Sequence, residues 1–256
     1  MNGMRITEES ILKSFSLLEE VYKEIPRTKG CEKACSPGGC KAYCCFYQTP
    51  SLFYSEFLYL WNDLMKTCST DIILLFITRS IKNFLRNSIT KTCVLFDEDN
   101  CRCFCHKTRP YCCYLYGVVH PHKWKKRVKS IKQQSLNDPA EDKKDLSRVI
   151  NQCDLVRCVD GRKHISEKQE DEWFERVKQS EIAIGVPQEI VDFLDQPKGS
   201  YRAIHDHIML NTFPADLLEM LSKQRVDRIS EKEINELTGV LLQKIENVAQ
   251  QSNVAV

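Results

Sequence analysis

The sequence has no run of apolar residues long enough to cross a bilayer. Its longest apolar stretch, Ile72–Thr78, is far shorter than the roughly 20 residues of a membrane-spanning helix. The first residues of the chain also lack a secretory pattern, because one early arginine is followed by acidic residues and not by an apolar segment. These absences predict a cytoplasmic protein without a membrane partner, and they exclude a disulfide-stapled extracellular scaffold.

Several familiar cysteine and phosphate motifs are missing as well. No C-x-x-C occurs, so the usual signature of zinc ribbons and of thioredoxin-type redox proteins is absent. Neither the C-x2-C-x2-C-x3-C-P run of bacterial ferredoxins nor the C-x3-C-x2-C spacing of radical S-adenosylmethionine enzymes is present. The chain has only 9 glycines and shows no Gly-rich phosphate loop or nucleophile elbow.

The chain is nearly neutral and of ordinary size. Its 256 residues predict one or two domains with a core that does not depend on disulfides. A formal net charge of +2 argues against a nucleic-acid partner. The basic segment Lys123–Lys132 is more readily explained as a solvated face than as an interface. A redox partner or a protein substrate is the partner class that we expect.

Cysteine is abundant, and its distribution is uneven. The chain has 14 cysteines, and all but two lie between Cys31 and Cys113. In the cytosol, clustered thiols bind metal or do redox chemistry more often than they form disulfides. Cys68, between two apolar helical patterns, is the one that we assign to the core, and the pair Cys153 and Cys158 fits either role. The predicted metal ligands are Cys31, Cys35, Cys40, Cys44, Cys45, Cys93, Cys101, Cys103, Cys105, Cys112 and Cys113.

Periodicity and capping residues predict a mainly α protein with a small β-hairpin, an α+β chain. A cysteine-rich metal-binding domain over residues 1–132 is followed by a helical C-terminal region over residues 145–256, with a polar linker between them. The first predicted helix begins at Thr7 and ends before Pro26. The other predicted helices span Ser51–Thr67, Thr70–Asn87, Ser166–Ser180, Pro187–Leu194, Tyr201–Leu210, Pro214–Lys223 and Ser230–Val248.

The hairpin prediction concerns residues Cys93–Cys105. The turn-forming residues Glu98–Asn100 separate two short segments of β type. A three-residue loop would place Cys93 opposite Cys105. Because side chains alternate along a strand, the cysteines of CRCFC would then project from one face of the hairpin. Thiolates from this hairpin and from two loops could converge on one metal site.

The first cysteine motif resembles that of a known family. Cys35, Cys40, Cys44 and Cys45 match the spacing C-x4-C-x3-C-C, and Cys93 opens the short segment CVLF. Both features resemble the cysteine-cluster proteins described as a zinc- or iron-chelating domain (CxxCxxCC type), a family that includes the flagellin lysine N-methylases.

The third motif of that family is similar to C-x-I-Y-x-x-R-P-x-x-C-R. The corresponding segment here reads CFCHKTRPYCCY and begins at Cys103, with Arg109, Pro110 and Cys113 in register. It departs from the family pattern at three positions, the first of which is Cys105. The resemblance covers about a third of the chain, and it implies a metal site without fixing a reaction.

Three functions follow as expectations. The leading one is an iron–sulfur protein with one or two clusters, 4Fe-4S favoured, in electron transfer or cluster-dependent catalysis. The resemblance to the methylases implies an S-adenosylmethionine-dependent protein lysine methyltransferase as the alternative. A structural zinc module for protein–protein interaction is the third. No catalytic residue can be named, and whether the chain is an oxidoreductase, an N-methyltransferase or no enzyme stays open.

Arg109 and the histidines give weaker signals. Arg109 could balance an anionic cluster or bind the carboxylate of a cofactor or substrate, and a role as an ordinary surface charge fits equally well. His205 and His207 are two residues apart, so they do not share a helical face, and we assign them to a helix surface.

Overall fold

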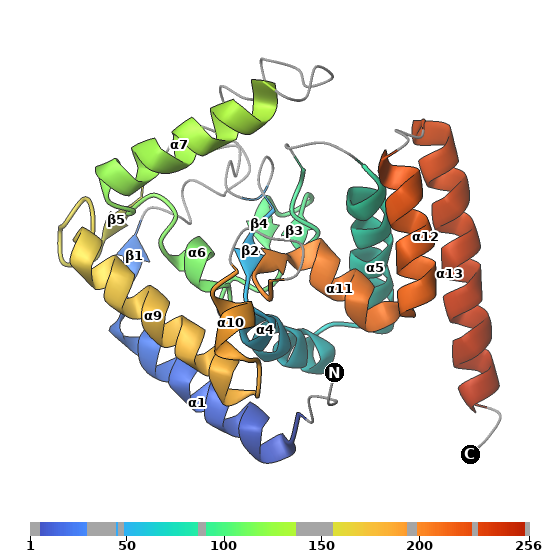
Figure 1. Cartoon of the computed structure of the whole chain (residues 1–256), viewed down its shortest axis with the longest axis horizontal. Coiled ribbons are helices and arrows are strands. Elements are labelled where there is room, and N and C mark those ends of the chain that lie inside the picture. The colour runs from blue at the N-terminus through green and yellow to red at the C-terminus, as the bar shows by residue number, and fades with distance from the viewer. Residues whose placement is uncertain are drawn as a thin grey trace. The chain divides into compact units, whose positions relative to one another are not determined.

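The chain divides into two compact units that are interleaved in sequence. Unit 1 comprises Met1–Thr67 and Ser88–Ile204, and unit 2 comprises Cys68–Asn87 and His205–Val256. The predicted sequential division into residues 1–132 and 145–256 stays a prediction. The structure is a computed structural model, shown in Figure 1, and it describes residues 6–29, 45, 49–86, 91–136, 156–193, 199–226 and 230–253.

Unit 1 is mainly helical with three two-stranded antiparallel sheets, which confirms the coarse fold class. Its helices are α1 (Glu8–Glu24), α4 (Tyr54–Thr67), α6 (Tyr111–Tyr114), α7 (Pro121–Leu136), α9 (Glu167–Ala183) and α10 (Gln188–Val191). Its strands are β1 (Thr28–Lys29), β2 (Ser51–Leu52), β3 (Phe96–Asp97), β4 (Arg102–Cys103), β5 (Arg157–Cys158) and β6 (Arg202–Ala203). Within the described ranges, no helix of either unit has both the length and the apolar composition that a membrane crossing requires.

Helix α1 begins and ends where the sequence predicts. The Thr7 hydroxyl accepts a hydrogen bond from the Ser10 backbone N–H at 3.1 Å, and the Ser10 hydroxyl accepts one from Thr7 N–H at 3.0 Å. This reciprocal cap satisfies two donors that a helix N-terminus leaves free. Leu18 and Val21 lie fully buried on the inner face of the helix.

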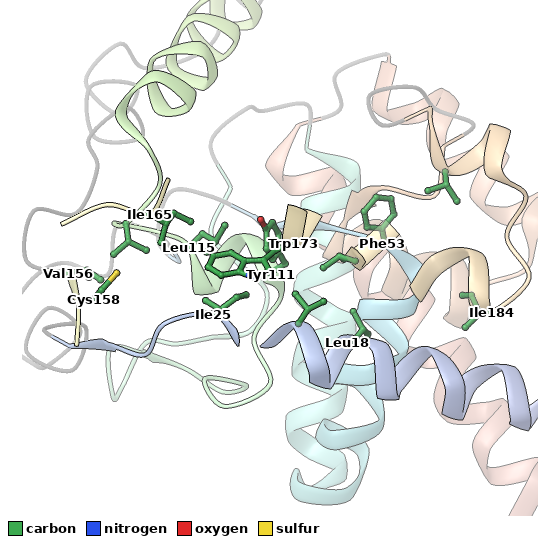
Figure 2. Packing of buried hydrophobic residues seen from close by; sticks show 14 of the residues in the cluster. Leu18, Ile25, Phe53, Tyr111, Leu115, Val156, Cys158, Ile165, Trp173 and Ile184 are labelled. Atoms are coloured by element: carbon green, nitrogen blue, oxygen red, sulfur yellow. The ribbon is translucent and has the colours of Figure 1, made fainter. Parts of the chain in front are cut away.

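The core of unit 1 joins segments that are far apart in the sequence. Figure 2 shows Leu18 of α1 and Phe53 packed together with Trp173 of α9 and with Tyr111 at the start of α6. Cys158 is buried in the same core beside Val156 and Ile165, away from the other described cysteines in sequence. Its place in strand β5 and its complete burial make it a core residue, as free cysteine commonly is.

Two of the sheets explain how distant segments are held together. Strand β1 pairs with β5, where Thr28 faces Cys158, and β2 pairs with β6, where Ser51 faces Ala203. Because Ser51 belongs to a strand, helix α4 begins at Tyr54, three residues later than predicted. These pairs are non-local, so no local sequence pattern could reveal them.

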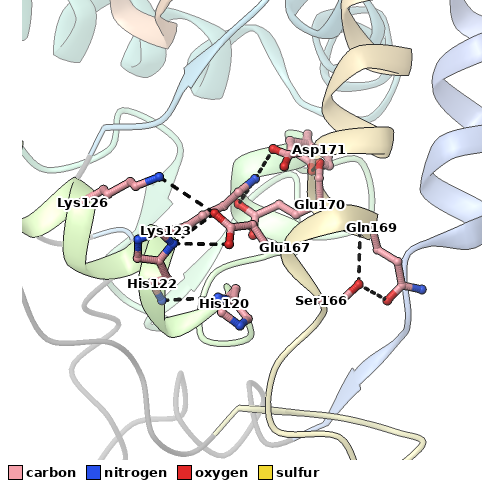
Figure 3. Close-up of polar contacts among 10 residues, drawn as sticks. His120, His122, Lys123, Lys126, Ser166, Glu167, Gln169, Glu170 and Asp171 are labelled. Carbon is pink, nitrogen blue, oxygen red and sulfur yellow. Dashed lines mark hydrogen bonds and ion pairs between the residues drawn. The ribbon is translucent and has the colours of Figure 1, made fainter.

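Ion pairs join the first turns of α7 and α9, as Figure 3 shows. His122 and Lys126 of α7 face the carboxylate of Glu167, and Lys123 lies between Glu170 and Asp171. The acidic first turn of α9 therefore neutralises part of the basic segment. Ser166 caps α9 as predicted, because its hydroxyl accepts a hydrogen bond from the Gln169 N–H at 3.2 Å.

The described part of unit 2 consists mainly of helices, and most of its buried side chains are apolar. Helices α12 and α13 both contact α5. Phe76 and Ile81 of α5 are fully buried, as is Leu221 of α12, while Ile234 of α13 is nearly so. The helices are α5 (Thr70–Leu85), α11 (Ile204–Thr212), α12 (Ala215–Val226) and α13 (Glu231–Asn253).

The prediction for His205 and His207 is wrong. Both side chains are buried, with 3 % and 2 % of their surface exposed. The two histidines do lie on different faces of the helix, as their spacing predicts. However, Ile204, Ile208 and Met209 of the same short helix are also buried. Helix α11 is thus covered on most of its circumference, and it has no wide solvent face on which the histidines could lie.

Candidate metal centre

The structure describes seven of the predicted cysteine ligands. These are Cys45, Cys93, Cys101, Cys103, Cys105, Cys112 and Cys113. The other four, Cys31, Cys35, Cys40 and Cys44, lie outside the described residues. Six of the described seven come together, as the following contacts show.

The end of the first motif lies beside the second motif. The backbone N–H of Cys93 donates a hydrogen bond to the carbonyl oxygen of Cys45 at 2.7 Å. Cys93 itself is buried and directly precedes the buried apolar run Val94–Phe96. Two chain segments separated by 48 positions in the sequence numbering are therefore joined at their cysteines.

The hairpin forms with a register one residue away from the predicted one. Phe96 faces Cys103 and Asp97 faces Arg102, so the turn holds four residues and includes Cys101. The Asp97 carboxylate accepts hydrogen bonds from the backbone and side-chain N–H groups of Asn100, at 3.1 and 2.8 Å. This acceptor stabilises the longer turn and moves Cys101 out of the strand.

Cys101 differs from its neighbours in conformation and in contacts. Its φ of 49° lies in the left-handed region, which side chains with a Cβ adopt rarely. Its thiol contacts the carbonyl oxygen of Glu98 in the turn at 3.6 Å, whereas no described cysteine thiol contacts it. The prediction that all three hairpin cysteines share one strand face is wrong, because the strand comprises only Arg102 and Cys103.

The remaining six cysteines gather in one region of unit 1. The sulfur of Cys103 lies 3.5 Å from that of Cys105, and it also receives a hydrogen bond from Cys45. Cys103 and Cys93 lie within electrostatic range of Cys113. The two sulfurs of the adjacent pair on helix α6 are 4.0 Å apart. We call this set the thiol cluster: Cys45, Cys93, Cys103, Cys105, Cys112 and Cys113.

Hydrogen bonding within the thiol cluster shifts the pKa values of its thiols in opposite directions. Hydrogen bonds from Cys105 and Cys45 hold the pKa of Cys103 well below its ordinary value. The same contact raises the pKa of Cys105, and the contact with Cys112 raises that of Cys113, with burial adding to both shifts. Of Cys103, Cys105 and Cys113, Cys103 is thus the one that most readily becomes a thiolate, and a bound cation would favour deprotonation of the other two.

A buried glutamate supports the helix that carries Cys112 and Cys113. The carboxylate of Glu56, only 3 % exposed, accepts hydrogen bonds from the backbone N–H of Tyr111 at 2.7 Å and from the hydroxyl of Tyr22 at 2.8 Å. Its second oxygen accepts one from the Phe53 N–H at 3.2 Å. Glu56 therefore caps α4 and α6 at once and fixes the two-cysteine turn against α1 and α4.

Burial raises the pKa of Glu56 from 4.5 to about 7, although the three donors oppose this shift. A second buried carboxylate, Glu181 of α9, contributes to the rise. Glu181 accepts a hydrogen bond from the Ser55 N–H at 2.6 Å, so it also caps α4. Two acidic side chains thus converge on one helix end, where the positive end of the helix dipole favours them.

Neither glutamate was among the predicted site residues. Glu56 lies in the first turn of an amphipathic helix and Glu181 near the end of another, where charged residues are normally exposed. Glu56 is three residues after the N-cap of α4, and this spacing could have indicated its hydrogen bond to the start of that helix. No sequence feature indicates its bond to Tyr111, which is 55 residues away.

Arg109, the predicted cofactor-binding residue, contacts His106, Thr28 and Tyr114. One guanidinium nitrogen is 2.9 Å from Nε2 of His106, another is 3.4 Å from the Thr28 hydroxyl, and the group lies 4.7 Å from the ring centre of Tyr114. Burial raises the pKa of Tyr114 and the Arg109 charge lowers it, while Cys105 and Cys113 raise it further. The Tyr114 phenol is therefore close to both Arg109 and the cluster.

Thiols are ligands that suit a thiophilic metal, but the described side chains are not arranged around a single metal position. No group of three or more His, Cys, Asp or Glu side chains among the described residues is arranged to hold a metal ion. Two thiolates on one tetrahedral ion with metal–sulfur bonds of about 2.3 Å would lie about 3.8 Å apart. The separations of 3.5 and 4.0 Å in the two cysteine pairs are on either side of that value.

Comparisons with known proteins assign no family to the chain. No family model, no curated protein and no solved structure matches it. The resemblance to the cysteine-cluster family therefore stays a prediction that rests on the motifs alone.

Proposed function

We propose that unit 1 is a cysteine-ligated metal centre, with an iron–sulfur cluster in a redox role as its leading form. One observation carries the proposal: thiols from separate segments gather in one region of unit 1, with direct contacts of Cys103 with Cys45 and Cys105 and of Cys112 with Cys113. Cys93 and Cys103 lie within electrostatic range of Cys113. Buried inert cysteines have no reason to converge from residues 45, 93, 103–105 and 112–113. Thiolates brought together from discontinuous segments are the usual ligand set of a metal cluster.

The number of thiols favours iron–sulfur over a single zinc ion. A structural zinc site uses four ligands, and the thiol cluster already has six. Cys35, Cys40 and Cys44 lie outside the described residues but precede Cys45 within ten positions of the sequence. Together these residues could hold one cluster of four thiolates or two such clusters. A bound cluster would supply reversible one-electron chemistry.

A thiolate-bound zinc ion is the second candidate, and the close sulfur pairs favour it. Each iron of a four-iron cluster binds its own cysteine, so the cysteine sulfurs lie farther apart than two ligands of one ion. The pair distances of 3.5 and 4.0 Å fit two ligands of one ion better. Transfer of a methyl group from S-adenosylmethionine, the remaining alternative, rests on the methylase resemblance, and calorimetric titration with that cofactor tests it.

Anaerobic purification followed by metal and acid-labile sulfide analysis tests the proposal. Iron with equimolar sulfide and a brown colour supports the iron–sulfur form, and stoichiometric zinc without sulfide supports the second candidate. Cys103→Ser should lose the metal, whereas Cys101→Ser in the same hairpin and Cys68→Ser should keep it. A protein that binds neither iron nor zinc in stoichiometric amount would sink the proposal.

A further inference from the structure

A cleft of about 780 Å³ is lined in part by His106 and Tyr114, the residues that directly follow Cys105 and Cys113 in the sequence. Its walls come from the end of α1, from strand β1 and its approach, and from the loop between Cys105 and Tyr114. All of its lining residues belong to unit 1 and to the described part of the chain. The volume falls within the range of small-molecule sites. We call it the basic cleft because of the charges described next.

The lining has an excess of positive charge. Four of the lining residues are Lys23, Arg27, Lys107 and Arg109, and Glu19 is the single acidic one. The Lys23 ammonium lies 3.7 Å from the Glu19 carboxylate, which cancels one charge of each sign. Three cations therefore remain without an ion-pair partner among the residues that the structure describes. Cations converging on one concavity raise the local concentration of anions.

Arg109 is the cation whose surroundings are least complete. Among the described residues, its two terminal nitrogens contact the His106 ring and the Thr28 hydroxyl and no carboxylate, and the contact with Thr28 is long at 3.4 Å. Its Nε is buried and has no hydrogen-bond partner. A partly buried guanidinium without a counter-ion is unfavourable, and its planar fork matches a carboxylate or a phosphate.

We propose that the basic cleft binds a small organic anion through a carboxylate or phosphate group held by Arg109. Lys107 and Arg27, both exposed at the rim, add long-range attraction. This site does not need the metal, so it goes beyond the proposed function. Its place beside Tyr114, whose phenol lies close to Cys105 and Cys113, puts the bound anion next to the thiol cluster.

Calorimetric titration of the full chain at low chloride tests the proposal with two probes, inorganic phosphate and succinate. We expect saturable binding of at least one probe with a Kd of about 1 mM or below. Binding of phosphate alone assigns a phosphate-bearing ligand, binding of succinate alone assigns a carboxylate ligand, and both outcomes support the site. Absence of saturable heat with both probes overturns it.

Three variants locate the binding. Arg109→Gln should weaken it about tenfold or more, because a hydrogen bond to a charged group is lost. Lys107→Gln should weaken it about twofold to fivefold and keeps the fold, since that side chain is exposed. Lys13→Gln removes the same charge from an exposed position of α1 outside the cleft and should change nothing.

The outcomes separate this site from the metal centre. Equal weakening in Lys13→Gln, or unchanged binding in both Arg109→Gln and Lys107→Gln, overturns the cleft assignment. Metal content is measured on the same samples. A preparation without metal that still binds succinate through Arg109 overturns the metal proposal and leaves the cleft in place, whereas a metal-loaded protein that binds neither probe does the reverse.

Discussion

The two units solve the same problem of burial with different chemistry. In unit 2, side chains such as Phe76 and Ile81 are buried between helices that contact one another. All buried carboxylates among the described residues, including Glu56 and Glu181, lie in unit 1, as does the thiol cluster. Buried acids and crowded thiols are costly to keep, and chains retain them where a function requires them. This difference is why the function that we propose lies in unit 1.

The aromatic residues make this comparison measurable. All three tryptophans and all nine tyrosines of the sequence fall within unit 1, and phenylalanine is the only aromatic residue type of unit 2. Tryptophan fluorescence therefore reports on unit 1 alone, whereas far-ultraviolet circular dichroism reports on the helices of both units. Each prediction below uses these two probes.

Loss of the metal should have the largest effect and should be confined to unit 1. We expect Cys103→Ser to lower the fluorescence transition by more than about 10 °C, because binding of a structural metal can contribute about 10 kcal/mol to folding. The circular-dichroism transition should shift less, since the helices of unit 2 carry no predicted ligand. Thermal scans of the two signals check this. Coincident shifts in both signals would break the comparison, and Cys68→Ser, in unit 2, is the matched control.

A matched pair of core truncations should sharpen the contrast. Phe53 and Phe76 are both fully buried, one in each unit. Truncation of either to alanine should cost about 3–5 kcal/mol through lost burial and a residual cavity. We expect urea unfolding by fluorescence to register Phe53→Ala strongly and Phe76→Ala weakly. Equal fluorescence shifts for the two variants would mean that the units unfold as one.

The stability of unit 1 should fall as the pH rises from about 4.5 to about 7. The folded-state pKa of Glu56 is raised from 4.5 to about 7, chiefly by burial, so the folded state keeps a proton that the unfolded state releases in this window. Protonated Glu56 therefore stabilises the folded state below pH 4.5. As the pH rises to about 7, the free energy of unfolding falls by about 3 kcal/mol at most.

Urea unfolding by fluorescence at several pH values checks this slope. Glu56→Gln removes the titrating group and should flatten the dependence, although it also loses one acceptor and lowers stability at low pH. An unchanged slope in the variant would assign the pH dependence to another group.

The smallest effect is expected for the surface ion pair of unit 2. Arg86 donates two hydrogen bonds of 2.8 Å to Glu231, joining α13 to the residue after α5. The side chains of Arg86 and Glu231 are 41 % and 63 % exposed, so Arg86→Ala should cost only about 0.5–1 kcal/mol. The loss should appear in circular dichroism, should diminish in high salt and should leave the fluorescence transition unchanged.

Local signals allowed much of the fold to be predicted, and non-local contacts account for the rest. The helices α1 and α9 follow from the caps at Thr7 and Ser166, because a cap involves only the next three residues. The pairing of Ser51 with Ala203 was not predicted, since strands of two residues have no periodicity to read. It moved the start of α4 from the predicted position.

The candidate site shows the same division. The motifs identified the cysteines that form the thiol cluster, because ligand type and spacing are written in the sequence. The predicted strand position of Cys101 was wrong, since the one-residue change in register depends on hydrogen bonds that Asn100 donates to Asp97 within the turn. Its assignment as a metal ligand stays a prediction. Glu56 was missed because its environment comes from Tyr22 and Tyr111, which lie on other elements.

The double cap of helix α4 has a consequence for the order in which the protein is made. Glu56 leaves the ribosome within α4, and Tyr111 follows it by 55 residues. Glu181 emerges 126 residues after Ser55, on the order of ten seconds later at the usual rate of translation. The whole set of cysteines from Cys31 to Cys113 is thus synthesised before its second supporting carboxylate exists. A metal delivered during synthesis would meet thiols on a scaffold held by Glu56 alone, and arrival of α9 would then close the assembly.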